Sequence, residues 1–247
     1  MQTNGIREIS TLREGNTSAI KCSGAVGEVS DFWVCTYPFF KTTLFILPSF
    51  ELAEGALELT SAVAVFDPDG EKINEASVSF SPGSVGTLEV DMLLGACKLE
   101  AGLKHGHLRV VSPPGCRHLC RIYARERGAI MGEPQQIGAG QAGFFPVVFG
   151  TDRFPYVALV NHGSNSAVVK SRLFCGNRTP ESEYLVPAMG ARIVALAAEF
   201  DEYVQSQGEK QIHAYLRLSV KDAVMLGAQL IERIVLGRDN ESYMALS

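Results

Sequence analysis

Three stretches of this sequence recur further along the chain at a nearly constant spacing. The aromatic pair in PFFKTTLFIL (38–47) reappears in GFFPVVFG (143–150), and Pro82 is matched by Pro187, each 105 positions later. The blocks GHLRVV and AYLRLS follow in the same order in the two halves. Because self-similarity at one period is the signature of repeated structural units, we predict two copies of one module.

The repeat sets the expected domain organisation. We predict an N-terminal segment (1–35), a first module (36–133), a linker (134–142) and a second module with a C-terminal tail (143–247). The linker region contains the string GAGQAG, which matches the G-x-G-x-x-G pattern of dinucleotide-binding loops. Pro146 and the β-rich run around it oppose the helix that such a loop requires. We therefore interpret the glycines as a flexible joint.

The pattern inside each predicted module is that of short β-strands. Residues 61–80 alternate apolar and polar side chains around the turn DPDG, which predicts a hairpin. Residues 159–174 repeat the pattern around a Gly/Asn/Ser turn and predict a second hairpin. Residues 91–103 and 199–207 could each contain one short helical turn. Because short strands with regular turn signals are typical of β-sandwiches, we predict an all-β fold of two tandem sandwiches.

A set of turn and strand residues occurs in the same order in both copies. Its members are Asn161, Ala167, Pro187, Leu216, Arg217 and Ser219 in the second copy, with Pro82, Leu108, Arg109 and Ser112 in the first. This order resembles the tandem immunoglobulin-like β-sandwich modules of bacterial proteins. The resemblance implies structural, adhesive, or carbohydrate- and partner-binding units, many of which belong to exported proteins.

Charge and composition narrow the expected function. The formal net charge is −5 and the pI is about 5.6, so a polyanion would meet net repulsion and we expect no nucleic-acid binding. No apolar run is long enough to span a bilayer, and the first residues lack the apolar core of a signal peptide. We therefore expect a cytoplasmic protein whose 6 cysteines are reduced.

The stretch GCRHLCRIYA raises the question of a metal site, because Cys116, His118 and Cys120 occupy alternate positions. In a strand these side chains share one face, and we predict that they are buried as core residues. The alternative is a metal site that also uses His105 and His107. An extended strand spaces alternate ligands about 6.5 to 7 Å apart, so at most two neighbours could share one ion.

The opposite face of the same strand is a candidate binding surface. The predicted binding residues are Arg109, Arg117, Arg121, Tyr123 and Arg125. Guanidinium groups around a tyrosine could bind a carboxylate, a phosphate or a sugar. The alternative is a solvated sheet face with unremarkable surface charges.

A second candidate surface is DFWVCTYPFF, the densest aromatic run of the chain. The predicted interface residues are Trp33, Tyr37, Phe39 and Phe40. One edge strand cannot easily bury so many aromatic rings, so we expect them to lie between modules or between subunits of a homo-oligomer.

No motif for a catalytic nucleophile, a catalytic metal or a nucleotide phosphate occurs in the sequence. We therefore expect a non-enzymatic structural, assembly or ligand-binding protein without a cofactor. Its partner would be another protein or a small anionic or sugar ligand. The alternative is a metal- or thiol-dependent protein that uses the region of Cys116, His118 and Cys120.

Overall fold

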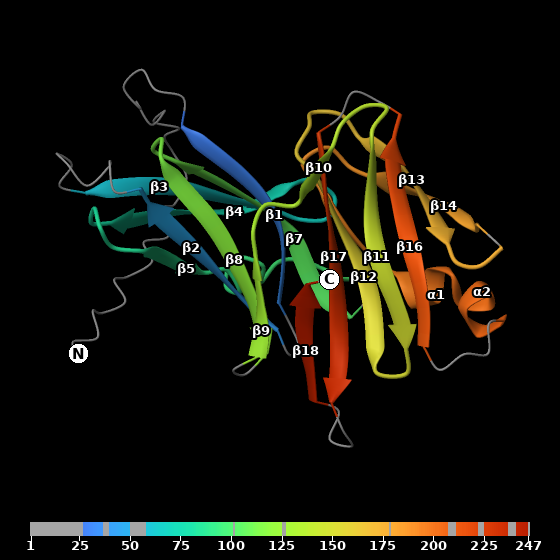
Figure 1. Ribbon diagram of the computed structural model, residues 1–247. Helices are drawn as coiled ribbons and strands as arrows, with labels where there is room; N and C mark the ends of the chain where they lie inside the picture. Colours follow the sequence, from blue (N-terminus) through green and yellow to red (C-terminus); the bar gives the residue numbers. More distant parts are fainter. Residues whose placement is uncertain are drawn as a thin grey trace.

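Antiparallel strands make up most of the protein (Figure 1). The computed structural model describes residues 27–36, 40–49, 58–100, 102–124, 127–177, 179–206, 211–221, 225–236 and 241–246. The helices α1 (Leu196–Glu199) and α2 (Asp201–Ser206) are short, and residues 91–96 form turns at the other expected helical position. Within the described ranges, no helix has the length and apolar character needed to cross a membrane.

The strands follow one another along the chain in two groups. The first group comprises β1 (Glu28–Thr36), β2 (Lys41–Pro48), β3 (Leu59–Phe66), β4 (Lys72–Phe80), β5 (Gly86–Glu89), β6 (Leu99–Glu100), β7 (Leu103–Ser112), β8 (Cys116–Ala124) and β9 (Arg127–Met131). The second group comprises β10 (Gln135–Ile137), β11 (Ala142–Gly150), β12 (Arg153–Asn161), β13 (Ala167–Phe174), β14 (Glu181–Val186), β15 (Ala191–Ala195), β16 (Gln211–Val220), β17 (Leu226–Leu236) and β18 (Glu241–Leu246).

The described strands form four antiparallel sheets. Sheet A has the order β1-β7-β3-β4 with β6 beside β7, and sheet B has the order β5-β2-β8-β9. Sheet C runs β15-β12-β17-β10 with β18 also beside β17, and sheet D runs β11-β16-β13-β14. Sheets A and D therefore have corresponding strand orders, and so do sheets B and C.

Two segments that the sequence analysis placed outside the modules take part in these sheets. Residues 28–36 form β1 and pair along their full length with β7. Residues 135–137, from the expected linker, form β10 and pair with the start of β17. From residue 30 onward β1 is buried at every position, because both of its faces are covered. Such a strand lacks the apolar–polar alternation by which half-buried strands are recognised.

The hairpin predicted for residues 61–80 is confirmed. β3 pairs with β4, and the Gly70 amide donates to the Asp67 carbonyl over 3.0 Å with Gly70 at φ 89°. A glycine suits this position because it reaches positive φ without a steric penalty.

The second predicted hairpin, at residues 159–174, is wrong. β12 pairs with β15 and β17 in sheet C, whereas β13 pairs with β14 and β16 in sheet D. The turn carries the chain from one sheet to the facing one, because turn residues specify a reversal of direction and not the hydrogen-bond partner. The buried Asn161 side chain stabilises this turn by donating to the carbonyls of Asn165 and Val186.

Sheet A is a layer between sheets B and C. Successive strand side chains point to opposite faces, and on one face Ser30 and Ser112 contact His118 of sheet B. On the other face His107 contacts the Met189 carbonyl, just before β15 of sheet C. Sheet A therefore packs against both sheet B and sheet C, and sheets C and D form the second sandwich. β18 of sheet C also lies beside β9 of sheet B (Figure 1).

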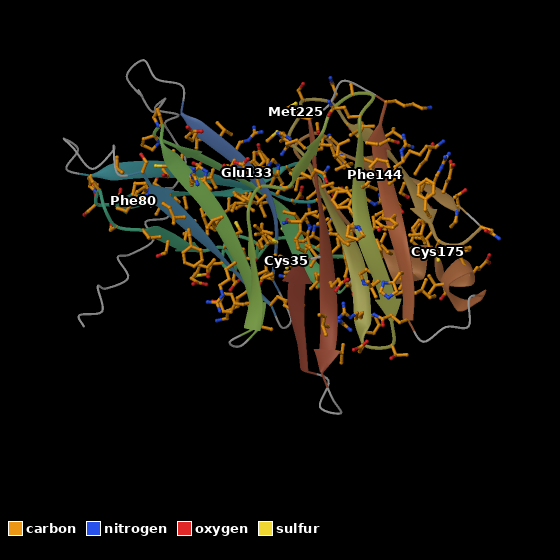
Figure 2. All side chains as sticks on the ribbon, viewed as in Figure 1. Cys35, Phe80, Glu133, Phe144, Cys175 and Met225 are labelled. Atoms are coloured by element: carbon orange, nitrogen blue, oxygen red, sulfur yellow. The ribbon has the colours of Figure 1, made fainter. Side chains whose placement is uncertain are left out.

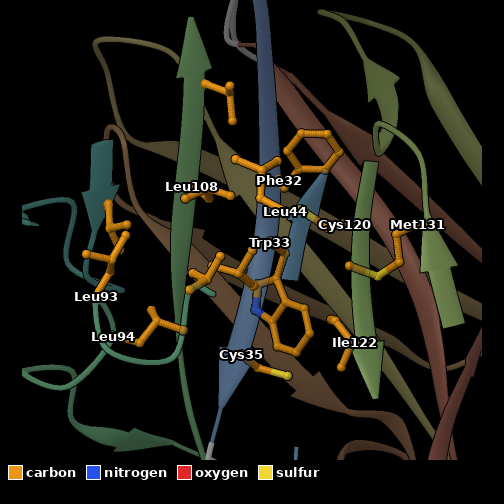
Figure 3. Packing of buried hydrophobic residues seen from close by; sticks show 14 of the residues in the cluster. Phe32, Trp33, Cys35, Leu44, Leu93, Leu94, Leu108, Cys120, Ile122 and Met131 are labelled. Carbon is orange, nitrogen blue, oxygen red and sulfur yellow. The ribbon is translucent and has the colours of Figure 1, made fainter. Parts of the chain in front are cut away.

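The buried apolar side chains of these sheets form two clusters. Figure 3 shows part of the first cluster, in which Phe32 and Leu108 face sheet B and Trp33 faces sheet C. The same cluster includes side chains from the near face of sheet C, namely Ala158, Val160, Ala191, Ile193 and Ile231. The second core lies between sheets C and D around Leu159 and Leu216. Sheet C is thus buried on both faces, which joins the two sandwiches.

Two turns also meet backbone to backbone at this junction. The Ala191 amide donates to the Pro68 carbonyl over 3.3 Å. A Cβ atom added at Gly70 would lie 2.0 Å from the Ala188 carbonyl oxygen, and one added at Gly190 would lie 2.5 Å from the Pro68 oxygen. The close approach of the two turns therefore requires glycine on both sides.

Candidate functional site

The structure brings together only part of the predicted arginine surface. Arg117, Arg121 and Tyr123 share the outer face of β8, where the Arg121 guanidinium lies 4.8 Å from the centre of the Tyr123 ring. This distance is within the range of a cation–π attraction. Arg109 belongs to a different surface, because it lies in β7 and faces sheet C. Arg125 lies outside the described residues.

Apolar side chains accompany these arginines on sheet B. Phe45 is directly opposite Leu119, and Leu47 is opposite Arg117. The three apolar side chains are half-buried. We call this surface the outer face of sheet B and define it by Phe45, Leu47, Arg117, Leu119, Arg121 and Tyr123. A mixture of arginine, aromatic and aliphatic side chains is typical of protein–protein contact surfaces.

The opposite side of β8 is buried, as its alternation predicted. Cys116, His118 and Cys120 all face sheet A and are at most 5% exposed. His118 Nδ1 lies 2.6 Å from the Ser30 hydroxyl, and His118 Nε2 lies 2.7 Å from the Ser112 hydroxyl. The ring is therefore held on both sides by residues of sheet A.

The hydrogen bonds around His118 form a polar network that runs from the first core to the exposed Glu133. Ser112 shares a hydrogen bond of 2.6 Å with Ser61, and Ser30 donates to Glu133. Serine, histidine and a carboxylate are also the components of a nucleophilic triad. Ser30 and Ser112, the two serines bonded to His118, are 5% and 2% exposed, and their hydroxyls are bonded to other side chains. Burial lowers the pKa of His118 although nearby carboxylates raise it, which favours the neutral ring.

The thiols should react slowly in the native protein. Burial raises the pKa of Cys35 and Cys120 far above the usual range, and raises that of Cys97 to about 11. The thiolate is the reactive species. In a Cys22→Ser variant, we therefore expect the five cysteines that the structure describes, all buried and free, to react with a colorimetric disulfide reagent only after denaturant is added. A fast native reaction, or fewer thiols in denaturant, would indicate a redox role.

The residues of the alternative metal site lie on two sides of sheet A. His105 and His107 are on the face toward sheet C, whereas Cys116, His118 and Cys120 pack against the opposite face. Among the residues that the structure describes, no three His, Cys, Asp or Glu side chains are placed to share a metal ion.

His105 has partners on both ring nitrogens. The Trp33 indole N–H donates to His105 Nδ1 over 3.2 Å, and His105 Nε2 lies 2.8 Å from a Glu100 carboxylate oxygen. Because the indole nitrogen can only donate, Nδ1 accepts, and the Nε2–H group donates to the Glu100 carboxylate. The ring thus orients Trp33, which is fully buried in the cluster that includes residues of sheet C.

Of the other predicted interface residues, the structure describes only Phe40. Phe40 is buried in the same cluster as Trp33. Tyr37 and Phe39 lie outside the described residues. Trp33 therefore contributes to the contact between the two sandwiches within one chain.

A group of charged side chains lies at this contact, and we call it the Asp31 cluster (Asp31, His107, Arg109 and His162). His107 Nε2 and Arg109 Nε lie 2.6 and 2.8 Å from Asp31 Oδ1. Arg109 Nη2 and His162 Nδ1 both lie 3.3 Å from Asp31 Oδ2. β1 supplies Asp31, β7 supplies two of its partners, and the turn after β12 supplies His162. The cluster therefore spans both sandwiches.

Backbone carbonyls of the second sandwich complete the Asp31 cluster. His107 Nδ1 lies 2.8 Å from the Met189 carbonyl, and Arg109 Nη2 donates to the His162 carbonyl over 3.1 Å. The two ring nitrogens of His107 thus face two acceptors, the Met189 carbonyl and the Asp31 carboxylate. Burial alone would raise the pKa of Asp31. Hydrogen bonds from His107, His162 and Arg109 outweigh burial and hold that pKa far below its usual range.

Arg109 and His107 were expected to have other roles, and Asp31 and His162 were not predicted as site residues. Arg109 was expected to bind a ligand and His107 to be a metal ligand, whereas both contact Asp31. One signal for Asp31 exists, because it directly precedes the apolar run FWVC and a buried acid requires a partner. Nothing in the sequence identifies His162 as that partner, since 131 positions separate it from Asp31.

Comparison with known proteins adds no family to these observations. No model of a known protein family matches the chain, and no curated protein matches its sequence.

Proposed function

We propose that this chain is a non-enzymatic assembly protein made of two immunoglobulin-like β-sandwich modules that form an internal repeat. The corresponding strand orders of sheets A and D, and of sheets B and C, support a repeat in which β11 corresponds to β1. The sequence match of residues 38–47 with residues 143–150 does not follow this correspondence, because residues 41–47 belong to β2. In this proposal the two modules act as one unit, because the Asp31 cluster and the shared core join them. The unit presents the outer faces of sheets B and D to partners.

One observation carries this proposal, namely the apolar surface on sheet D. Phe144 and Tyr215 are 59% and 61% exposed on the neighbouring strands β11 and β16, and Pro146 is directly opposite Tyr215. Val168 and Leu185, which are paired across β13 and β14, are also exposed on this face, on the far side of the Lys170–Glu181 and Arg172–Glu181 ion pairs. Figure 2 labels Phe144 on β11. Large apolar side chains that gather on one exposed face typically mark a site of protein contact.

The hydrogen bonds of the buried histidines support a non-enzymatic role. The three histidines of sheets A and B all have hydrogen-bond partners on both ring nitrogens. These partners are protein groups inside the cores or at the junction of the sandwiches. These three histidines therefore stabilise the fold.

The outer face of sheet B suggests the chemistry of a second contact. Arg117 and Arg121 would favour a protein surface with carboxylates, or a small anionic or sugar ligand. We further propose a cytoplasmic, reducing location, which is supported by the five buried free thiols of the described residues.

The apolar face of sheet D provides the test. A tagged chain would be recovered with its bound proteins from cells that naturally express it, and compared with a Phe144→Ser/Tyr215→Ser variant. We expect the variant to lose most of the bound protein, because truncating central aromatic contacts weakens binding about tenfold or more. A matched control, Val29→Ser/Met225→Ser, removes exposed apolar side chains elsewhere and should bind normally. Equal recovery with both variants would refute the proposal.

A further inference from the structure

The face of sheet A that contacts sheet C has a counterpart on sheet D. Phe66 is directly opposite His107 in sheet A, and Phe174 is directly opposite Tyr215 in sheet D. With this register, three pairs of identical residues occupy corresponding positions: Phe66 with Phe174, Arg109 with Arg217 and His105 with His213. The two faces are therefore related in sequence as well as in strand order.

Within the chain, the face on sheet A is covered by the near face of sheet C. Trp33 lies on this face of sheet A and is fully buried in one cluster with Val160, Ile193 and Ile231. This face of sheet A therefore packs against the side of sheet C, on β12 and β17, that points away from sheet D.

The corresponding face of sheet D is open. The pairing with Arg217 places Phe144 where sheet A has Asp31, and the pairing with Tyr215 places Pro146 where sheet A has Trp33. Phe144, Pro146 and Tyr215 are all exposed. An apolar ring thus stands where sheet A has the acid of the Asp31 cluster, and the ion pairs of this face, Lys170–Glu181 and Arg172–Glu181, lie on β13 and β14, whereas Phe144 and Tyr215 lie on β11 and β16.

The outer face of sheet B corresponds to the surface that sheet C uses. In strand order β2 corresponds to β12 and β8 corresponds to β17. The pairs Leu44–Cys120 and Val157–Leu230 both lie inside their sandwiches, so the neighbouring pair Phe45–Leu119 corresponds to Ala158–Gln229. Phe45 and Leu119 are half-buried, which leaves apolar surface for a further contact.

We propose that copies of this chain bind head to tail, with the outer face of sheet B of one copy covering the outer face of sheet D of the next. This inference rests on the assembly function proposed above and names the partner as a second copy. The contact repeats between chains the arrangement of sheets A and C within one chain. Because the two faces differ, the contact is heterologous, and each added copy leaves one face of each kind open.

Sedimentation of the purified full-length chain tests this contact. We expect the mean mass of the wild-type protein to rise steadily with concentration. A sheet D variant (Phe144→Ser/Tyr215→Ser) and a sheet B variant (Leu119→Ser/Tyr123→Ser) should each associate about tenfold or more weakly. The control Val29→Ser/Met225→Ser should behave as the wild type. A wild-type protein that stays monomeric at all concentrations, or full association of either face variant, would overturn the proposal.

Mixing the two face variants distinguishes a head-to-tail contact from a symmetric one. The sheet D variant keeps its sheet B face and the sheet B variant keeps its sheet D face, so together they can form one intact contact. We expect a one-to-one dimer that does not grow further. If the sheet B variant alone forms dimers and mixing adds nothing, two sheet D faces bind each other and the head-to-tail arrangement is wrong.

A cross-linking experiment on the unmodified sequence gives the result if a variant fails to fold. Lys41 is on the outer side of sheet B and Lys170 is on the outer side of sheet D. In a mixture of isotopically labelled and unlabelled chains, we expect cross-links between Lys41 of one copy and Lys170 of another. Their absence under associating conditions would overturn the proposed contact. If the chain is monomeric but its sheet D variant still fails to recover a different bound protein, the head-to-tail contact is wrong and the assembly function proposed above still holds.

Discussion

Replacing Asp31 with asparagine lowers the free energy of unfolding by about 3 to 5 kcal/mol, the range found when one partner of a buried ion pair is removed. The carboxylate accepts hydrogen bonds from His107 and Arg109 and lies beside His162, and its side chain is 7% exposed. The amide of asparagine would leave the Arg109 guanidinium without a counter-charge and would direct N–H groups at other donors. Urea unfolding followed by fluorescence of Trp33, the single tryptophan, measures the change.

The exposed Asp152 provides a matched control, since Asp152→Asn makes the same chemical change at the surface. We expect its effect to stay within about 0.5 kcal/mol. An equally small effect of Asp31→Asn would show that the Asp31 cluster does not stabilise the junction.

The same pair of proteins gives a pH dependence with a definite sign. In the folded protein the pKa of Asp31 lies far below its usual range, whereas in the unfolded chain it titrates near about 4. The contribution of Asp31 to stability is therefore complete above about pH 4 and is lost as the pH falls toward the folded pKa. The difference in stability between wild type and Asp31→Asn should be constant near neutral pH and shrink in acid.

A Gly70→Ala substitution separates the two sandwiches. Gly70 has φ 89°, and an added Cβ would lie 2.0 Å from the Ala188 carbonyl oxygen across the junction. Alanine at positive φ costs about 1 to 3 kcal/mol. The overlap with backbone adds about 1 to 3 kcal/mol, because neither turn can move without breaking the Ala191–Pro68 hydrogen bond. We expect a lower urea midpoint and a red shift of native Trp33 fluorescence.

Gly83 isolates the contribution of the junction. Its φ is 80°, close to that of Gly70, but a Cβ there meets nothing within 4 Å. Gly83→Ala should therefore show the backbone strain without the overlap and should leave Trp33 fluorescence unchanged. If the two substitutions were equally destabilising and spectroscopically alike, the close approach of the two turns would not contribute to stability.

Local patterns predicted those parts of the fold in which one side of a strand is solvated. The alternation of residues 116–124 correctly predicted which side chains of β8 are buried, and the turn at DPDG correctly predicted the β3–β4 hairpin. The same reasoning failed for residues 159–174, whose strands belong to facing sheets. It also placed residues 28–35 outside the first module, since a strand buried on both faces has no alternation.

The candidate site was harder to predict from the sequence than the fold was. Arg117, Arg121 and Tyr123 share a face because they alternate along one strand, which a sequence pattern can reveal. Arg109 was grouped with them by charge alone, and its actual partners are Asp31 and the His162 carbonyl. Hydrogen-bond partners brought together from separate strands depend on sheet order and register, which single-strand patterns do not contain.

The sequence by itself determined that the chain is a succession of short antiparallel strands and which side chains of a strand share a face, because the side-chain period of a strand is two. Only the tertiary structure decided what covers each face. Phe66 and Arg109 on sheet A have the same identities as Phe174 and Arg217 on sheet D. Sheet C nevertheless covers the face of sheet A, whereas the outer face of sheet D is open. The physical reason is that burial of a sheet face depends on the packing of another sheet, and that packing joins residues far apart in the chain.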